Sequence, residues 1–341
     1  MITTVFATTV GLAMVNIFKP GDVFPDDKQE QYREQFGGQV ELRQESAREI
    51  EKQSPLFFFE DMIPENFFKA AGDNSKMLQI IFFAILFSIA LVLVPGQKTQ
   101  VVKDFFDGLN DVILKIVDLI MRFAPIGVFA LMAALVVDFS GDADIFTALG
   151  MYMLTVIIAL FIMILLFYPI LMRIFTRMGI KTFLKGILPA QLVGFTTSSS
   201  AATLPVTLKQ VTNELKVSKP IANFVLPVGV TINMDGTSCY QAIAAVFIAQ
   251  VFGIDLTLVQ QLTIVLTATL ASIGSPGIPS GSIVMLIIVL NSVGLPVEGL
   301  ALILGVDRPL DMLRTAVNIT GDSTVASIVA SSEGELGESD S

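Results

Sequence analysis

A charge-free apolar run, Met77 to Val94, most restricts what this chain can fold into. As a helix, a run of this length crosses about 30 Å of hydrocarbon. A second apolar run extends from Ile145 to Tyr168. The chain is 53% hydrophobic and 15% charged, with a mean hydropathy of +0.73. Because soluble domains carry about 25% charged residues, these features predict an all-α, polytopic integral membrane protein in the lipid bilayer.

The distribution of charge predicts which loops face the cytoplasm. The loop 138–145, before the second run, is acidic and has no basic residue. Four basic residues follow the same run: Arg173, Arg177, Lys181 and Lys185. Short basic loops stay on the cytoplasmic side, so we place 172–186 on the cytoplasmic side of a cell membrane and 138–145 on its outer side. The acidic tail 333–341 is expected to be a disordered cytoplasmic end.

Charge and residue usage exclude several functions. The net charge is −10, which argues against a nucleic-acid partner. The chain has no histidine, the commonest metal ligand and general base. Its single cysteine, Cys239, cannot form an internal disulfide and is expected to pack inside a span. We therefore expect a protein that is not an enzyme and has no resident cofactor.

A polar face interrupts the apolar C-terminal region. Asp311, Arg314, Asn318 and Asp322 follow one another at spacings of three, four and four, which places them on one side of a helix. Ionised groups at bilayer depth cost several kcal/mol unless they are paired or face a wet cavity. We therefore predict a substrate or ion pathway. The alternative is a structural pair of Asp311 with Arg314, which leaves the other two side chains without partners.

Two further apolar stretches contain small polar residues. FTTSSSAATLP occupies 195–205, and ASIGSPGIPSG occupies 271–281. Serine, glycine and proline break helices, and irregular backbone at membrane depth survives only where protein or a wet cavity satisfies it. We predict two re-entrant hairpins, at about 182–215 and 257–293, with surface turns between full spans as the alternative. Paired interruptions of this kind indicate a transporter binding site.

Between the predicted hairpins, a helix over 220–252 is expected to be broken at NMDGT, Asn233 to Thr237. An unwound turn beside Asp235 exposes backbone carbonyls at membrane depth. Carbonyl, amide and carboxylate oxygens are the ligands of a small hard cation. Asp235 and Asp322 supply the charge for such a site, and Asn233 and Asn318 supply neutral oxygens.

Four motifs in this order, TTSSSAATLP, NMDGT, SIGSPGIPSG and LDMLRTAVNITGD, resemble those of the dicarboxylate/amino acid:cation symporters, the family of the glutamate transporters. The resemblance runs from Thr3 to about Ala330. It implies an elevator-type transporter, in which a transport domain slides across the membrane against a scaffold that forms a homotrimer. Relatives carry two helices and the start of a third before the first residue of this chain, and we expect these to be absent.

The resemblance also implies a division of the chain. Residues 1–18 are expected to form part of a transmembrane helix of the transport domain, and 19–74 a charged extracellular loop. Scaffold and trimerisation helices are expected at 75–144. The rest of the transport domain, 145–332, is expected to end in a helix over 299–330.

Roles in substrate binding follow from the resemblance residue by residue. Asp311 would receive the amino group of the substrate, and Arg314 would hold its side-chain carboxylate, as the planar guanidinium fork allows. The presence of both implies an acidic amino acid, with aspartate and glutamate left open. The further substrate contacts implied are Ser199, Ser200, Thr237, Ile278, Gly281, Thr315 and Asn318.

Sodium ions, as coupling ions, would occupy three sites by the same resemblance. The first would use Gly229, Asn233, Asn318 and Asp322. The second would use Thr231, Ser272, Ile273 and Ser275. The third would use Asp235 with Thr3 and Thr4. Relatives add to this third site a tyrosine that would precede Met1, so we expect the site to be incomplete.

One departure concerns a second arginine that many acidic amino-acid carriers keep. Ser198 and Met312 stand at the two places where the family has it. We hypothesise that Arg308, one turn before Asp311, takes over its pairing.

The sequence thus predicts secondary active symport of aspartate or glutamate. Oxygen clusters without a histidine or glutamate relay favour sodium as the coupling ion, and the proton stays open. An ion or solute channel is one alternative. Another is an intramembrane aspartyl protease using Asp235 and Asp322, but the Gly-x-Gly-Asp signature is missing before Asp322.

Overall fold

A computed structural model describes residues 1–24, 63–64, 66–71, 77–121, 126, 143–273 and 281–337. These residues form helices and turns, with one isolated β-bridge between Val217 and Leu336. The predicted all-α class is therefore confirmed. The chain divides into two compact units: unit 1 comprises Met1–Glu49 and Asp142–Ser341, and unit 2 comprises Ile50–Gly141.

Unit 2 contains three described helices: α4 (Phe67–Ala71), α5 (Met77–Leu93) and α6 (Gly96–Met121). The charge-free run predicted from the sequence forms α5. Aromatic side chains join α5 to α6, with the ring centroids of Phe87 and Phe106 5.7 Å apart.

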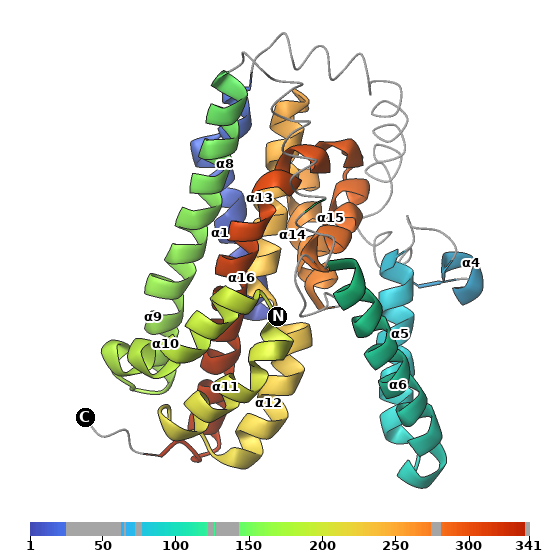
Figure 1. The fold of residues 1–341 in the computed structure, drawn as a ribbon, viewed down its shortest axis with the longest axis vertical. Coiled ribbons are helices and arrows are strands. Elements are labelled where there is room, and N and C mark those ends of the chain that lie inside the picture. The colour runs from blue at the N-terminus through green and yellow to red at the C-terminus, as the bar shows by residue number, and fades with distance from the viewer. Residues whose placement is uncertain are drawn as a thin grey trace. The chain divides into compact units, whose positions relative to one another are not determined.

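Unit 1 is organised around its last helix, α16 (Leu300–Ser332), drawn in red in Figure 1. This helix contacts the N-terminal half of the unit through α8 and α9, and the central part through α10, α11, α12 and α13. The first helix, α1, packs on α13, α14 and α8. The bounds before α16 are α1 (Ile2–Phe18), η1 (Pro20–Val23), α8 (Ala143–Ile162), η3 (Met163–Phe167), α9 (Tyr168–Phe175), α10 (Ile180–Thr197), α11 (Ser200–Asn213), α12 (Lys219–Ile232), α13 (Asp235–Val251), α14 (Leu258–Ile273), α15 (Gly281–Ser292) and η4 (Val297–Gly299).

Two stretches of the described residues are long and apolar enough to cross a membrane, Ile2–Val23 and Phe146–Phe175. The second contains most of the predicted run Ile145 to Tyr168. Two more, Phe82–Leu93 and Leu258–Ser272, are apolar but shorter.

The two interrupted stretches form pairs of contacting helices. α10 packs against α11, and α14 packs against α15. α10 ends because Ser198 adopts a left-handed φ of 52°, and α11 begins because the Ser199 hydroxyl accepts a hydrogen bond from the Ala202 N–H at 3.1 Å. The tip between α14 and α15, 274–280, lies outside the described residues.

The helix break in NMDGT is narrower than predicted. Asn233 and Met234 leave helical geometry, with φ of −111° and −101°, and α13 resumes at Asp235. An acidic residue in the first turn is favourable because it faces the positive end of the helix dipole. Asp235 therefore begins the second helix instead of lying inside the break.

The tail after Ser332 corrects another expectation, that it is disordered from Glu333. Residues Glu333 to Gly337 turn back onto the connection between α11 and α12. The Gly337 N–H donates to the Lys216 carbonyl at 2.9 Å, and the Ser218 hydroxyl donates to the Glu335 carboxylate. Backbone pairing of this kind holds a short polar segment that composition alone describes as unstructured.

Candidate functional site

The polar face of α16 points into unit 1. Asp311, Arg314, Asn318 and Asp322 are all buried, none more than 6% exposed. Thr315 lies beside them and is also buried. Their common burial confirms that the four residues lie on one face of the helix.

Arg314 lies between two carboxylates. Its Nη2 donates to Asp311 Oδ1 at 2.8 Å, and its Nη1 lies 2.9 Å from Asp307 Oδ1. The guanidinium also stacks on the Tyr240 ring, 3.8 Å from the ring centroid. Arg314 Nε makes no hydrogen bond to any described residue. Among the described residues, the buried Arg314 guanidinium thus faces the carboxylates of Asp307 and Asp311.

The sequence analysis missed Asp307. It lies four residues before Asp311, so it extends the same face by one turn, and that signal was present in the spacing. Arg308, proposed above as a partner for this region, is exposed and makes no ion pair or hydrogen bond with a described residue. The geometry therefore does not support the hypothesis that Arg308 replaces the second arginine, and the added partner of Arg314 is an anion, Asp307.

Hydroxyl, amide and carboxylate oxygens converge at the start of α13. Thr4 Oγ1 donates to Asp235 Oδ1 at 2.8 Å, and Thr3 Oγ1 lies 3.3 Å from the same oxygen. Thr3 Oγ1 also donates to Asn233 Oδ1 at 2.9 Å. The residues predicted for the third cation site are thus brought together, and their donor set is that of a small hard cation.

A second group of oxygens adjoins the first. Asn233 Nδ2 donates to Asp322 Oδ1 at 3.2 Å. A Cβ added at Gly229 would lie 2.6 Å from the same carboxylate oxygen, so the backbone of α12 comes very close to Asp322. Three residues predicted for the first cation site are therefore neighbours: Gly229, Asn233 and Asp322.

Asn318 on α16 contacts the first residues of α13. Its Oδ1 accepts a hydrogen bond from the Gly236 N–H at 2.8 Å, and its Nδ2 lies 3.3 Å from Thr237 Oγ1. The side-chain amide therefore holds the beginning of α13 against α16, directly after Asp235. Thr237, predicted as a substrate contact, belongs to this group.

The remaining predicted residues are distributed differently. Ser199 and Ser200 are buried at the α10–α11 turn, and a Cβ at Gly194 in α10 would lie 3.4 Å from Thr315 Cγ2. Thr231 is exposed, and no hydrogen bond between described residues joins it to the buried Ser272. Ser275 and Ile278 lie outside the described residues, as does the side chain of Ile273, and Gly281 is described only as the first residue of α15.

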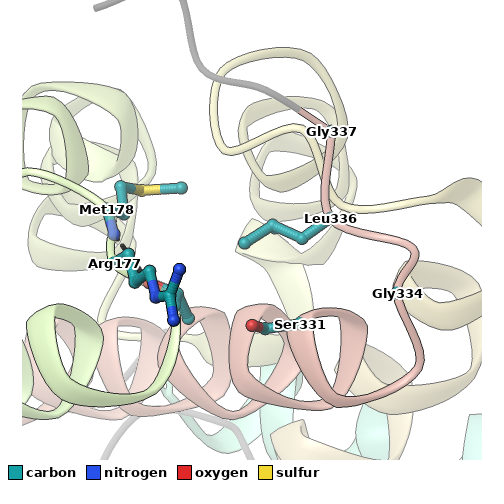
Figure 2. A pocket seen from close by; sticks show the side chains of 7 residues that line it. Arg177, Met178, Ser331, Gly334, Leu336 and Gly337 are labelled. Atoms are coloured by element: carbon teal, nitrogen blue, oxygen red, sulfur yellow. Dashed lines mark hydrogen bonds between the residues drawn. The ribbon is translucent and has the colours of Figure 1, made fainter.

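A cavity of about 370 Å³ lies elsewhere in unit 1 (Figure 2). It is lined by the turn after α9 and by the end of the chain, including Arg177, Ser331 and Leu336. None of its lining residues belongs to the polar groups on α13 and α16. It is therefore separate from the candidate site.

A cluster of buried charges and oxygens inside a bundle of apolar helices is typical of an integral membrane protein. The sequence profile of the sodium:dicarboxylate symporter family matches residues 1–332. The chain belongs to this family, and the resemblance described from its motifs is confirmed.

Three curated relatives are similar over most of this chain. Excitatory amino acid transporter 1 of Ambystoma tigrinum is 45% identical over 270 residues, which are 79% of this chain and 49% of that protein. Excitatory amino acid transporter 3 of Mus musculus is 45% identical over 258 residues, 76% of this chain and 49% of that protein. Excitatory amino acid transporter 4 of Rattus norvegicus is 45% identical over 248 residues, 72% and 44%. The chain spans about half the length of the curated relatives it matches.

Proposed function

We propose that this chain binds an acidic amino acid, aspartate or glutamate, together with sodium ions, and transports them by secondary active symport. The observation that carries the proposal is the position of Arg314 on one helical face between Asp307 and Asp311, next to Asn318. A guanidinium binds a carboxylate through two parallel hydrogen bonds. Asp311 would exchange its contact with Arg314 for the ammonium group of the substrate.

Sodium ions would occupy the oxygen groups around Asp235 and Asp322, as cargo of the transport reaction. The oxygens offered there are carboxylate, amide and hydroxyl groups. Sodium, like calcium, is a hard cation that favours such ligands. In the described part of the chain no hydrogen bond joins the Asp235 and Asp322 carboxylates, and the family is one of symporters, so the protease alternative is not retained.

The two helical pairs, α10 with α11 and α14 with α15, are proposed to be re-entrant hairpins in the membrane. We assign unit 1 to the moving transport domain, and α5 and α6 of unit 2 to the scaffold of a homotrimeric elevator. The basic turn at Arg177 and the C-terminal segment line one cavity, which supports placing both on the same, cytoplasmic side.

Binding of aspartate, glutamate and succinate to the purified chain, with sodium present or replaced by potassium, tests the proposal. We expect both amino acids to bind in sodium and neither in potassium. Succinate lacks the ammonium group and should bind at least about ten-fold more weakly, because Asp311 then loses its partner. Equal binding in both salts, or equal binding of succinate, would contradict the proposal. Saturable, concentrative uptake into vesicles separates a symporter from a channel.

A further inference from the structure

Tyr168 is a buried side chain beside the Asp235 carboxylate, and it was not among the residues predicted from the sequence. It is the first residue of α9, and its side chain is fully buried. Its hydroxyl donates a hydrogen bond to Asp235 Oδ2 at 2.8 Å. Thr4 donates to the other oxygen, Oδ1, and the Thr3 hydroxyl oxygen lies 3.3 Å from it. One oxygen of the Asp235 carboxylate is therefore bound by α9 and the other by α1.

A π-helical turn places Tyr168 on this side of its helix. α8, η3 and α9 are consecutive, and η3 (Met163–Phe167) has π geometry. Tyr168 follows Tyr152 by four steps of four residues. In a regular α-helix, each such step rotates the side-chain direction about 40° beyond one full turn. After four such steps the two side chains would point roughly 160° apart. Because a π turn takes more residues per rotation, it offsets part of this drift, and both tyrosines are buried.

Gly321 on α16 leaves the room in which these groups meet. A Cβ at this position would lie 3.0 Å from the Tyr168 hydroxyl, 2.9 Å from Asn233 Nδ2 and 3.1 Å from Asp235 Oδ2. The phenol, the amide and the carboxylate therefore converge on one side of α16, one residue before Asp322. The tyrosine is part of this oxygen cluster and does not merely pack against its edge.

We infer that Tyr168 is a positioning residue for the cation at Asp235, an inference that rests on the function proposed above. The torsion that rotates a carboxylate about its terminal bond is broad and weakly restrained. A fixed donor on Oδ2 restricts that rotation and keeps Oδ1 directed at Thr3 and Thr4. The site is thereby preformed before a sodium ion enters, and its size is set by α9 as well as by α1 and α13.

Sodium binding to the purified full chain without amino acid tests the inference. The measurement is the sodium concentration that gives half of the maximal rise in melting temperature. For Tyr168→Phe we expect this concentration to rise about ten-fold, the effect of losing one hydrogen bond to a charged group. Tyr152→Phe is the matched control: Tyr152 on α8 is also a fully buried tyrosine, but no hydrogen bond joins its hydroxyl to the oxygens around Asp235. It should change the concentration less than two-fold.

Two further readouts separate positioning from general destabilisation. A loosened carboxylate should discriminate less between ions of different size, so the ratio of half-saturating lithium to sodium should move toward one in Tyr168→Phe. In an Asp235→Asn background the same change should add less than two-fold. A sodium response of Tyr168→Phe equal to the wild type would overturn the inference, as would an unchanged ion ratio. If the wild-type chain itself showed no sodium response, the proposed function would fail instead.

Discussion

At the scale of single residues, the guanidinium of Arg314 is held by Asp307 and Asp311, and we predict that Asp307 sets the affinity for substrate. In Asp307→Asn, Arg314 keeps Asp311 as its one carboxylate partner among the described residues. A substrate must then separate Arg314 from Asp311, and the Asp307 carboxylate no longer competes with Asp311 for the guanidinium. We expect the dissociation constant for aspartate in sodium, measured by calorimetry, to rise about ten-fold or more.

Arg308→Ala provides the control for this prediction. Arg308 is the next residue along the chain, but its side chain is exposed and pairs with no described residue. Its removal should leave the affinity for aspartate within about two-fold of the wild type. A similar loss in both variants would show that the general charge of the region, and not the Asp307–Arg314 contact, controls binding.

Spacing along the helix therefore predicted which residues share the polar face of α16, but it did not predict which charges pair. Asp307, Arg308 and Asp311 all lie within two turns, and burial decides between them: Asp307 is 2% exposed, whereas Arg308 faces outward. Tyr168 had no comparable signal. Its partner, Asp235, is far away in sequence, and although Pro169 indicates an irregular turn in the helix, it does not indicate which distant side chain Tyr168 meets. Contacts of this kind depend on tertiary packing, which periodicity does not contain.

At the scale of elements, the contact between α13 and α16 depends on the absence of a side chain at Gly236. A Cβ there would lie 2.6 Å from the Arg314 carbonyl oxygen and 2.9 Å from Val317 Cβ. We predict that Gly236→Ala separates the two helices, breaks the Gly236–Asn318 hydrogen bond and lowers the free energy of unfolding by about 1–3 kcal/mol. Sodium affinity should fall as well, because Asp235 moves with α13. Thermal melting with and without sodium measures both effects.

Gly150→Ala is the matched control for Gly236→Ala. Gly150 lies on α8, and a Cβ there meets no atom within 4 Å. The substitution should raise the free energy of unfolding by about 0.4–1 kcal/mol, because alanine restricts the unfolded chain. Sodium affinity should not change. Equal destabilisation by the two substitutions would contradict the close-packing argument.

The elements themselves were predicted well where a helix had to end. The breaks at Ser198 and at Asn233 follow directly from local chemistry, a serine run and an NMDGT turn. The tail Glu333 to Gly337 was predicted wrongly, since its composition is polar and its order comes from pairing with Lys216 and Ser218. Local propensity thus predicted where the two helices end, but it contains no information on backbone pairing between distant segments.

At the scale of the whole molecule, the candidate site draws on nearly the full length of the chain, from Thr3 on α1 to Asp322 on α16. Asn318 joins its two parts, because one amide contacts both the Gly236 N–H and the Thr237 hydroxyl. If sodium binds at these oxygens as proposed, a cation that fixes the start of α13 would also fix the side chains proposed to face the substrate. Such a link would make the two binding reactions mutually dependent, and the dependence must be equal in both directions.

We predict that saturating sodium raises the affinity for aspartate by at least about ten-fold, within the usual range of coupling between sites. Saturating aspartate should raise the affinity for sodium by the same factor, since both measure one coupling free energy. In Asn318→Ala the amide link is lost, and the factor should fall toward one even where aspartate still binds at high concentration. Calorimetric titration of each ligand with and without the other provides both factors, with potassium as the control ion. Full coupling in Asn318→Ala would show that the connection between the cation and substrate groups runs through other residues.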